Sequence, residues 1–356
     1  MRILVLPCDG IGPEIVQSSM SVLQAVNGKF NLGLQFDYDD VGFKSLEQHG
    51  TTLRDQVLEK AKTYDGIILG TQSHADYPAP EQGGRNVSAG FRIGLDLYAN
   101  VRPARTRPFL ASNMKEGKRM DLVIMREATE GFYPDRNMTR GWGEVMPSPD
   151  MALSTRKITR HCSERIARRA FELAMKRNKK VTAIHKSNSF HMTDGLFLEC
   201  VRDVARDFPE VALDDLLVDA STAHLVRSPE RFDVLVATNF YGDIISDLAS
   251  ELSGSLGLAG SIMASDTHCC AQAQHGSAPD IAGQDKANPV SMILSVAMLL
   301  DWMGEHHGKP ALSDAARVME QAVDRVLEDP ARRTADLGGR LGCRAFGEAV
   351  AEVING

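Results

Sequence analysis

The stretch RFDVLVATNFYGDIISDLASEL, residues 231–252, shows how the chain is organised. Residues 233–237 are mostly apolar, which is typical of a buried strand, and the residues after them place apolar side chains at helical spacing. The same change from a short apolar run to a longer amphipathic stretch recurs along most of the sequence. Strand–helix alternation of this kind predicts an α/β fold with a largely parallel sheet.

The other expected elements extend this pattern in both directions. Strands are expected at 2–7, 65–70, 121–125, 181–185 and 216–218, and helices at 13–26, 53–62, 162–177, 189–207, 289–303, 313–327 and 345–354. Two segments, 73–90 and 135–156, show little periodicity. In a compact domain such segments are usually functional loops or interface arms.

Composition narrows the class of protein. The chain has 356 residues, 43% hydrophobic and 24% charged, which suits two α/β domains or one large one. Its formal net charge is −7 with acids and bases interspersed, so no nucleic acid partner is expected. The six cysteines lack zinc-ligand spacing and are expected to be reduced thiols. The first apolar run, about five residues long, is too short for a signal peptide or membrane span, so we expect a soluble cytoplasmic protein without a membrane partner.

Three glycine-containing segments could contact a nucleotide. CDGIGPE at 8–14 follows the first expected strand, but Ile15 occupies the position of the third glycine in a dinucleotide-binding motif. GSLGLAG at 254–260 lacks a preceding strand and a following helix, so a standard Rossmann site is not expected. HGSAPDIAGQDKANP at 275–289 could wrap a nucleotide with main-chain groups. Structural turns are the alternative interpretation of the first and third segments.

Asp243 and Asp247 are four residues apart on an expected helix, so both carboxylates leave the same face about one turn apart. Two carboxylates placed in this way can bind a hard divalent cation such as Mg²⁺ or Mn²⁺. A solvated polar face is the alternative. The buried-looking strand directly before them favours a site, because α/β folds place sites at the carboxyl ends of strands.

Several other residues could handle an acidic substrate. Arg102 and Arg126 lie in strand-like segments, where a buried guanidinium needs a partner, and together with Arg92 they would suit a di- or tricarboxylic acid. Tyr133 and Lys186 could carry protons. Judged singly, the arginines could instead form surface salt bridges, and the other two could simply lie in a turn and at a helix start.

These residues belong to longer blocks of sequence. The blocks are LPCDGIGPEI at 6–15, LDLYANVRP at 95–103, REATEGFY at 126–133, HKSN at 185–188, VDASTAHLVRSPERFDVLVATNFYGDIISDLASELSGSLGLAGS at 218–261 and HGSAPDIAG…ANP at 275–289. In this order they resemble the isocitrate/isopropylmalate dehydrogenase family of β-decarboxylating dehydrogenases, essentially from end to end. So many blocks in one order make the resemblance highly specific.

The resemblance implies an α/β, isopropylmalate dehydrogenase-like two-domain fold that is not a Rossmann fold. Residues 1–98 plus 253–356 would form the large cofactor-binding domain. Residues 99–252 would form a small domain with a dimerising arm, the dimer interface and most substrate and metal residues. The protein would be a homodimer with shared active sites.

The resemblance also implies roles, position by position. Arg92, Arg102 and Arg126 would bind the substrate carboxylates. Tyr133 would donate a proton to the enol left by decarboxylation. Lys186, from the partner subunit and beside Asp219, would act in proton transfer from the substrate hydroxyl. The ligands of Mg²⁺ or Mn²⁺ would be Asp219, Asp243 and Asp247. The residues along NAD would be Ile11, His275, Gly276, Ala278, Asp280, Ile281 and Asn288.

The implied reaction is oxidation of a 3-substituted (2R)-malate by NAD, with metal assistance, followed by decarboxylation. Asp280 stands where NAD-dependent members carry an acid for the adenosine ribose hydroxyls, and a carboxylate there would repel the 2′-phosphate of NADP. TEG at 129–131 leans toward isocitrate-, homoisocitrate- and tartrate-type members. Gln272 replaces a glutamate that usually precedes the histidine–glycine block.

A further departure from the family pattern bears on the substrate. Isopropylmalate enzymes carry Glu-x-x-Leu-Leu-x-x-Arg where this chain has RNVSAGFR, with Arg85 at the glutamate position and Ser88 and Ala89 replacing the leucines. If the segment is helical, Arg85 shares a face with Arg92. We therefore expect Arg85 or Ser88 to read a polar or anionic C3 substituent, as in isocitrate or homoisocitrate. Isopropylmalate, D-malate or tartrate is the alternative substrate, and a non-catalytic regulatory subunit is the alternative class.

Overall fold

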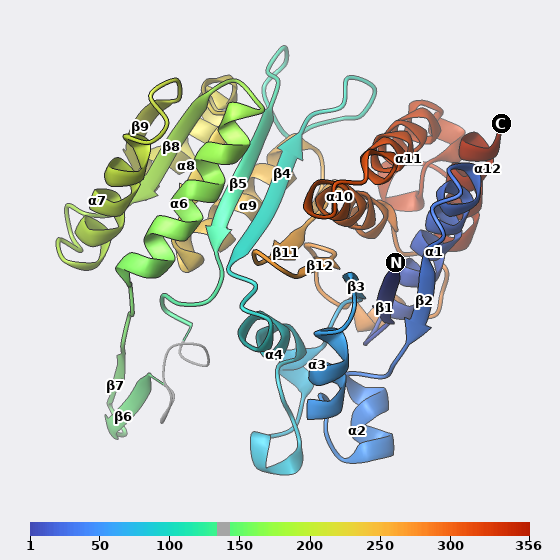
Figure 1. Cartoon of the computed structure of the whole chain (residues 1–356), viewed down its shortest axis with the longest axis horizontal. Coiled ribbons are helices and arrows are strands. Elements are labelled where there is room, and N and C mark those ends of the chain that lie inside the picture. The colour runs from blue at the N-terminus through green and yellow to red at the C-terminus, as the bar shows by residue number, and fades with distance from the viewer. Residues whose placement is uncertain (134–142) are drawn as a thin grey trace. The chain divides into compact units, whose positions relative to one another are not determined.

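The computed structural model describes residues 1–133 and 143–356, and the chain divides into two compact units. The terminal unit contains both chain ends and consists of Met1–Leu95, Pro108–Ala111 and Leu256–Gly356. The middle unit consists of Asp96–Arg107 and Ser112–Ser255. The elements of both units are labelled in Figure 1. The domain boundaries and roles expected from the sequence stay predictions.

A mainly parallel sheet forms the centre of the terminal unit, with the strand order β2-β1-β3-β12-β11. β1 (Arg2–Leu6) pairs in parallel with β2 (Gln35–Tyr38) and β3 (Gly66–Leu69), and β12 (Cys269–Gln272) pairs in parallel with β3. β11 (Ile262–Ala264) is antiparallel to β12. β1 and β3 are almost completely buried, which is why both are continuous apolar runs rather than alternating ones.

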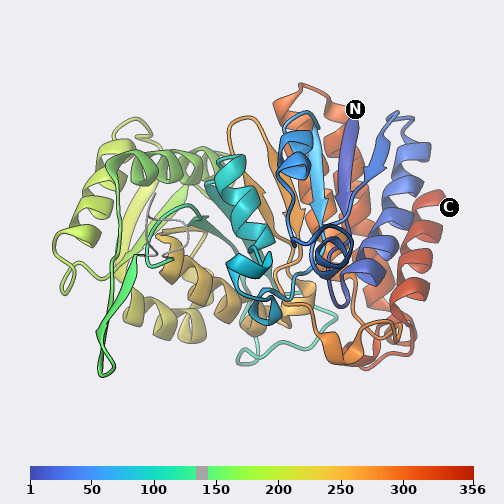
Figure 2. The ribbon, with the colours of Figure 1, turned by 90° about the horizontal axis from the view of Figure 1, so that it is seen from below.

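Helices from the two chain ends meet in the terminal unit. α1 (Gly12–Lys29) packs along α12 (Cys343–Asn355), as Figures 1 and 2 show. α10 (Val290–His306) contacts β12 and α11 (Pro310–Glu328), and most of its side chains are buried, as expected for a helix that is apolar on nearly all sides. Shorter helices are α2 (Phe43–His49), α3 (Asp55–Ala61) and α4 (Val87–Gly94).

The sheet of the middle unit has the order β4-β5-β10-β8-β9. β4 (Ala99–Arg105) is antiparallel to β5 (Asp121–Glu127). β10 (Val234–Ala237), β8 (Lys180–His185) and β9 (Ala212–Leu217) continue from β5 in parallel.

Helices cover both faces of this middle sheet (Figures 1 and 2). They are α6 (Arg160–Met175), α7 (Thr193–Ala205), α8 (Val218–Arg227) and α9 (Asn239–Ser253). Val234 and Val236 of β10 enter the core under α6 and α7, whereas Leu235 and Ala237 enter the core under α8 and α9. Because successive side chains of a strand point to opposite faces, a fully apolar strand such as β10 requires both layers.

An antiparallel hairpin also belongs to the middle unit. It pairs β6 (Glu144–Ser148) with β7 (Met151–Ser154), so the irregular structure expected for 135–156 is wrong for this part. Residues 134–142 of that segment lie outside the described chain. The side chains of the hairpin are mostly exposed, and strands that bury no face lack the alternation by which a sequence reveals them.

The other expected elements are present with shifted ends. The strand expected at 216–218 begins earlier, and α8 already starts at Val218. The helix expected from 189 begins only at Thr193, and α4 begins at Val87 inside a segment expected to be irregular to residue 90. No helix of the described chain is long and apolar enough to cross a membrane. None of the six cysteines, all of which lie in the described part of the chain, forms a disulfide bond.

Candidate active site

Arg126 lies buried at the carboxyl end of β5, against the start of α9. Its Nε and Nη2 donate to the side-chain oxygen of Asn239 at 2.9 and 2.7 Å, and Asn239 donates to the Glu130 carbonyl at 2.8 Å. Gly242 permits this close approach, because a Cβ there would lie 2.7 Å from both Cβ and Cγ of Arg126. The guanidinium is therefore fixed between a strand end and a helix start.

Asp243 and Asp247 of α9 face two buried arginines. Arg102 Nη1 lies 3.2 Å from a carboxylate oxygen of each aspartate, and Arg126 Nη1 pairs with Asp243 Oδ1. Arg102 also donates to Ser246 Oγ at 2.7 Å. Burial and the nearby Arg126 lower the pKa of Arg102 to about 10. The aspartates are thus more than a solvated polar face, because they neutralise two cations that the fold buries.

Tyr133 joins the same group. Its hydroxyl donates to Asp243 Oδ2 at 2.5 Å, and Cζ of Arg126 lies 5.4 Å from the centre of its ring. A phenol held between a carboxylate and a guanidinium keeps one position, from which its proton can be donated to a reacting atom. The predicted residues that the structure brings together in the middle unit are Arg102, Arg126, Tyr133, Asp243 and Asp247.

Lys186 and Asp219 form a second group in the middle unit. Lys186 follows β8 and Asp219 lies in the first turn of α8, with 2.7 Å between Nζ and Oδ1. The hydrogen bond from Lys186 holds the pKa of Asp219 below its usual value. Within the described residues, no three His, Cys, Asp or Glu side chains lie close enough together to hold a metal ion. Asp219 therefore does not join Asp243 and Asp247 within one chain.

The carboxylates of Asp243 and Asp247 nevertheless fit a hard divalent cation. They project from one face of α9, remain partly exposed, and offer the oxygen donors that Mg²⁺ and Mn²⁺ prefer. Two carboxylates are too few for a six-coordinate cation, so other ligands must come from substrate, water or a second chain.

In the terminal unit, Ser88 and Arg92 lie one turn apart on the same face of α4. Both are buried and both contact Met263 of β11, whose sulfur lies 2.9 Å from Arg92 Nε and 3.8 Å from Ser88 Oγ. The side chain of Asn86 accepts a hydrogen bond from the Ala89 N–H and so caps this helix.

Arg85 does not share that face. It precedes the N-cap of α4, and its Nη1 donates to the Leu53 carbonyl at 2.7 Å and pairs with Asp55 at 2.8 Å. The expectation that Arg85 and Arg92 lie on one helical face is wrong, because seven-residue spacing has this meaning only inside a helix. Arg85 instead connects the start of α4 to the start of α3.

Gln272, the residue that replaces a family glutamate, ends β12. Its Oε1 accepts from Ser88 Oγ at 3.1 Å, and its Nε2 donates to the Gly70 carbonyl at 3.2 Å. A glutamate in this position would turn a negative oxygen toward that carbonyl. The amide instead makes a neutral pair with Ser88, one turn from Arg92.

The residues expected to contact NAD lie on two touching loops of the terminal unit and on the segment that leads into α10. Ile11 N–H donates to the Ser277 carbonyl at 2.8 Å and so joins the loop after β1 to the loop at 275–281. Gly10, with φ of +58°, allows this approach, because a Cβ there would lie 2.1 Å from the same carbonyl oxygen. The residues on the second loop are His275, Gly276, Ala278, Asp280 and Ile281, and Asn288 precedes α10.

This second loop is held by local bonds. Ala278 takes a left-handed conformation with φ of +37° and begins a 3₁₀ turn on which Asp280 is exposed. Asn288 donates to Asp336 at 3.0 Å. Burial lowers the pKa of His275, so its imidazole is neutral at physiological pH.

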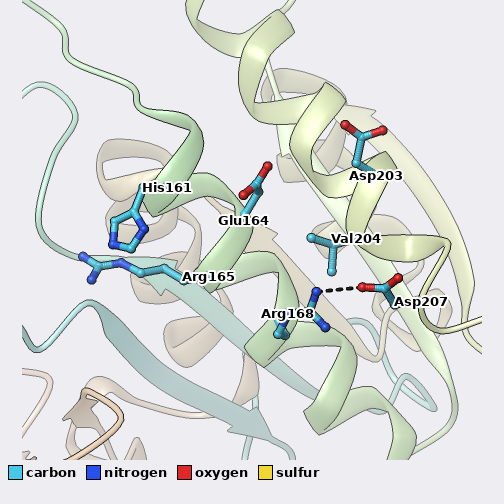
Figure 3. Close-up of a pocket in the computed structure, with 7 residues that line it drawn as sticks. All are labelled: His161, Glu164, Arg165, Arg168, Asp203, Val204 and Asp207. Atoms are coloured by element: carbon cyan, nitrogen blue, oxygen red, sulfur yellow. Dashed lines mark hydrogen bonds and ion pairs between the residues drawn. The ribbon is translucent and has the colours of Figure 1, made fainter.

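A pocket of about 420 Å³ lies elsewhere in the middle unit, between α6 and α7 (Figure 3). Its lining residues are His161, Glu164, Arg165, Arg168, Asp203, Val204 and Asp207. Two of its cations already have carboxylate partners, since Arg168 pairs with Asp207 at 2.7 Å and Arg165 with Asp96 at 2.6 Å. The pocket contains none of the residues predicted for the site, and we assign it no part in the chemistry.

Sequence reasoning missed Asn239, which accepts hydrogen bonds from Arg126, and Ser246, which accepts one from Arg102. Both lie on the face of α9 that carries Asp243 and Asp247. Asn239 is one turn before Asp243, and Ser246 lies between the two aspartates. A polar residue on that face, directly after a buried strand, is the signal that could have identified them.

Comparison with known proteins identifies the class as dehydrogenases that decarboxylate oxidatively. The family model described as isocitrate/isopropylmalate dehydrogenase matches residues 2–350, and the chain belongs to this family. It is 42% identical to the isocitrate/homoisocitrate dehydrogenase of Thermus thermophilus over 354 residues, which cover 99% of this chain and 98% of the relative. It is 38% identical to the 3-isopropylmalate dehydrogenase of Archaeoglobus fulgidus over 355 residues, 99% of each chain.

A solved structure agrees with this relationship. The crystal structure of isocitrate dehydrogenase from Methylococcus capsulatus superposes with a TM-score of 0.87 at 38% identity, covering 100% of this chain and 99% of that one. The expected isopropylmalate dehydrogenase-like α/β fold, which is not a Rossmann fold, is confirmed.

Proposed function

We propose that this protein uses NAD and Mg²⁺ or Mn²⁺ to oxidise and decarboxylate a (2R)-malate that bears a polar or anionic C3 substituent. The observation that carries the proposal is the gathering of two buried arginines and Tyr133 around Asp243 and Asp247. The relatives support the substrate class, since their names include isocitrate, homoisocitrate and 3-isopropylmalate.

Charge balance explains how this group would accept an acidic substrate. Arg102 and Arg126 pair with the two aspartates, so the four charges cancel. Asp243 and Asp247 would hold the cation, and Arg102 and Arg126 would then bind the substrate carboxylates, which guanidiniums can do in a bidentate manner. Tyr133 would keep a proton on its hydroxyl for the carbon from which carbon dioxide departs.

NAD would supply the hydride acceptor, and the cation would supply a Lewis acid for the C2 oxygen. We assign NAD binding to the two touching loops that contain Ile11 and residues 275–281, together with Asn288. The exposed carboxylate of Asp280 would accept from ribose hydroxyls and would repel a 2′-phosphate.

Our candidate for contacting the C3 substituent is Ser88 rather than Arg85. We assign Arg92, one turn away on α4, to the binding of a substrate carboxylate. Ser88 and Ala89 are small and buried where isopropylmalate enzymes carry leucines, so an isopropyl group would lose apolar contacts here. The neutral pair of Ser88 and Gln272 offers hydrogen-bonding groups and no negative charge against an anionic substituent. Isopropylmalate, D-malate and tartrate are the alternative substrates.

A second copy of the chain would complete the site. Lys186 and Asp219 stay separate from Asp243 within one chain, and we propose that a partner subunit supplies them. The middle unit exposes many large apolar side chains, which often mark a surface covered by another protein. They are Val145, Met146, Met151 and Leu153 of the hairpin, and Phe190, Met192, Val226, Phe240 and Ile244 near α7, α8 and α9.

NADH formation with a panel of isocitrate, homoisocitrate, 3-isopropylmalate, D-malate and tartrate tests this function. We expect isocitrate or homoisocitrate to give the highest kcat/KM, EDTA to abolish turnover, and added Mn²⁺ to restore it. A protein that reduces NAD with none of these acids, in the presence of metal, refutes the proposal. If 3-isopropylmalate is the best substrate, the assignment of the substituent is wrong while the reaction class stands.

A further inference from the structure

A buried ion pair lies in the middle unit outside the residues discussed so far. Arg156 Nη1 is 2.5 Å from Asp194 Oδ1, and the two side chains are 5% and 0% exposed. Arg156 also donates to the hydroxyls of Thr193 and Thr238, at 3.2 and 3.1 Å. These bonds connect the segment after β7 with the start of α7 and the end of β10.

Aromatic rings surround the cation of this pair. Cζ of Arg156 lies 5.0, 5.2 and 5.3 Å from the ring centres of Tyr241, Phe132 and Phe190. Each distance is within the range of a cation–π interaction, and a planar guanidinium can stack on rings in a way that an ammonium cannot. One of the rings, Phe132, directly precedes Tyr133 in the chain.

The anion of the pair holds the other proton-transfer candidate. Asp194 Oδ2 accepts the backbone N–H of Lys186 at 2.6 Å. Lys186 in turn extends its ammonium to Asp219. The carboxylate therefore fixes the main chain from which the lysine side chain departs, while its partner Arg156 packs on the residue next to the tyrosine.

A buried ion pair is weak evidence of stabilisation, because apolar residues of similar volume often hold a core equally well. Here the hydrogen bond from the Lys186 N–H to Asp194 fixes the main chain of one residue to which the proposed function assigns proton transfer, and Arg156 contacts the ring of Phe132, which directly precedes the other, Tyr133. We propose that Arg156 and Asp194 form a positioning pair that sets Tyr133 and Lys186 in place. This inference rests on the proposed function.

The variants Asp194→Asn and Arg156→Lys test the pair. Asp194→Asn keeps the shape of the side chain and removes its charge, whereas Arg156→Lys keeps the charge and removes the planar guanidinium. Asp194→Asn should lower kcat for the hydroxy acid about tenfold or more, which is a part of the roughly 100-fold or larger contribution of a general acid or base, with KM for NAD unchanged. It should affect decarboxylation of the corresponding β-keto acid less, since that half-reaction needs Tyr133. Arg156→Lys should slow both half-reactions and alter the pH profile of kcat. The double variant Arg156→Gln, Asp194→Asn removes both charges and should not restore kcat.

Arg168→Gln is the matched control, because it removes an arginine of α6 whose pair with Asp207 is half exposed (Figure 3). It should leave kcat, both half-reactions and the pH profile unchanged. Tyr133→Phe and Lys186→Met report separately on the proposed function, which fails if both retain full activity. If those two are impaired while the Asp194 and Arg156 variants keep the parental kcat and pH profile, the positioning role is overturned. The positioning role is also overturned if the activity lost by the Asp194 and Arg156 variants equals the fraction of unfolded protein that circular dichroism measures.

Discussion

Coenzyme choice is the first property that we assign to a single side chain, at the surface of the terminal unit. Asp280 is exposed on its 3₁₀ turn, where a carboxylate would repel a 2′-phosphate. The parent enzyme should therefore prefer NAD to NADP by more than about tenfold in kcat/KM, or about 1.4 kcal/mol. Asp280→Lys should narrow or reverse this ratio, whereas Glu348→Lys, an equal charge change on α12, should not. Equal use of both coenzymes by the parent would contradict the assignment.

Substrate ranking is the second property that we assign to individual side chains. Ser88→Leu with Ala89→Leu should raise kcat/KM for 3-isopropylmalate relative to isocitrate, because it restores apolar contacts and removes a hydroxyl. Pocket changes of this size are worth about 1–3 kcal/mol, or roughly 10- to 200-fold. Arg85→Ala is the control: its guanidinium is occupied by Asp55 and the Leu53 carbonyl, so the ranking should stay the same. A change of ranking in the control, or none in the double variant, would refute this reading.

Arg85 also shows where residue-level prediction stops. Sequence spacing anticipated that Asp243 and Asp247 share a face, because four residues inside one helix fix that geometry. The partner of Arg85 lies 30 residues earlier, on α3, and no local pattern specifies such a contact. The pairing of Arg126 with Asn239 depends in the same way on how β5 meets α9.

Packing of α9 against β5 is a property of elements, and Gly242 tests it. Gly242→Ala would place a methyl group 2.7 Å from Cβ and Cγ of Arg126, so the helix or the arginine must move. Overpacking of this kind should cost about 1–3 kcal/mol in the free energy of unfolding and should lower kcat by displacing Arg126. Gly195→Ala on α7 meets no atom within 4 Å and should leave stability equal or raise it by about 0.5 kcal/mol. Urea denaturation of both variants measures the difference, and equal effects would contradict the packing argument.

The contacts of Glu130 at the start of α6 should make the free energy of unfolding depend on pH. Glu130 accepts hydrogen bonds from the N–H and hydroxyl of Thr159, the N-cap, and burial and the nearby Glu127 raise its pKa above 4.5. An acid with a raised pKa in the folded state stabilises the fold at low pH and loses that contribution as the pH rises through the folded pKa. The free energy of unfolding of the parent should therefore fall relative to Glu130→Gln as the pH rises from 4.5. A difference that is constant with pH would show that Glu130 does not titrate as described.

Helices and strands were predicted correctly where the segment is long or where its buried side chains follow a regular pattern. The sequence predicted α10, α11 and β10, because their residues are either apolar without interruption or apolar with a period of 3.6 residues. α4 was not, because Gly90 and Gly94 obscure a helix of eight residues that Asn86 caps. The hairpin of β6 and β7 was not, because its exposed strands carry no buried face.

At the scale of the whole molecule, the residues of the proposed site form two groups within each chain. Asp243 lies with Arg126 and Tyr133, whereas Asp219 lies with Lys186. In a homodimer with shared sites, one site would combine Asp243 of one chain with Asp219 of the other. Co-expression of Asp219→Asn chains with Asp243→Asn chains should then restore activity that neither variant has alone.

The size of the restored activity follows from the symmetry of a dimer. Random pairing makes half of the dimers mixed, and each mixed dimer has one site with both aspartates intact and one with neither, so about a quarter of the parental kcat per chain is expected. The matched control mixes Asp243→Asn with Asp247→Asn chains. Both lesions then fall in the same part of the site, and every dimer, mixed or not, lacks an intact site. No restoration in the first mixture, at equal dimer content, would mean that Asp219 serves the site of its own chain. Restoration in the control would mean that Asp243 and Asp247 do not serve the same site. The separation of Asp219 from Asp243 within one chain favours restored activity in the first mixture, because a cation held by two carboxylates needs further oxygen ligands and a second subunit would supply one of them.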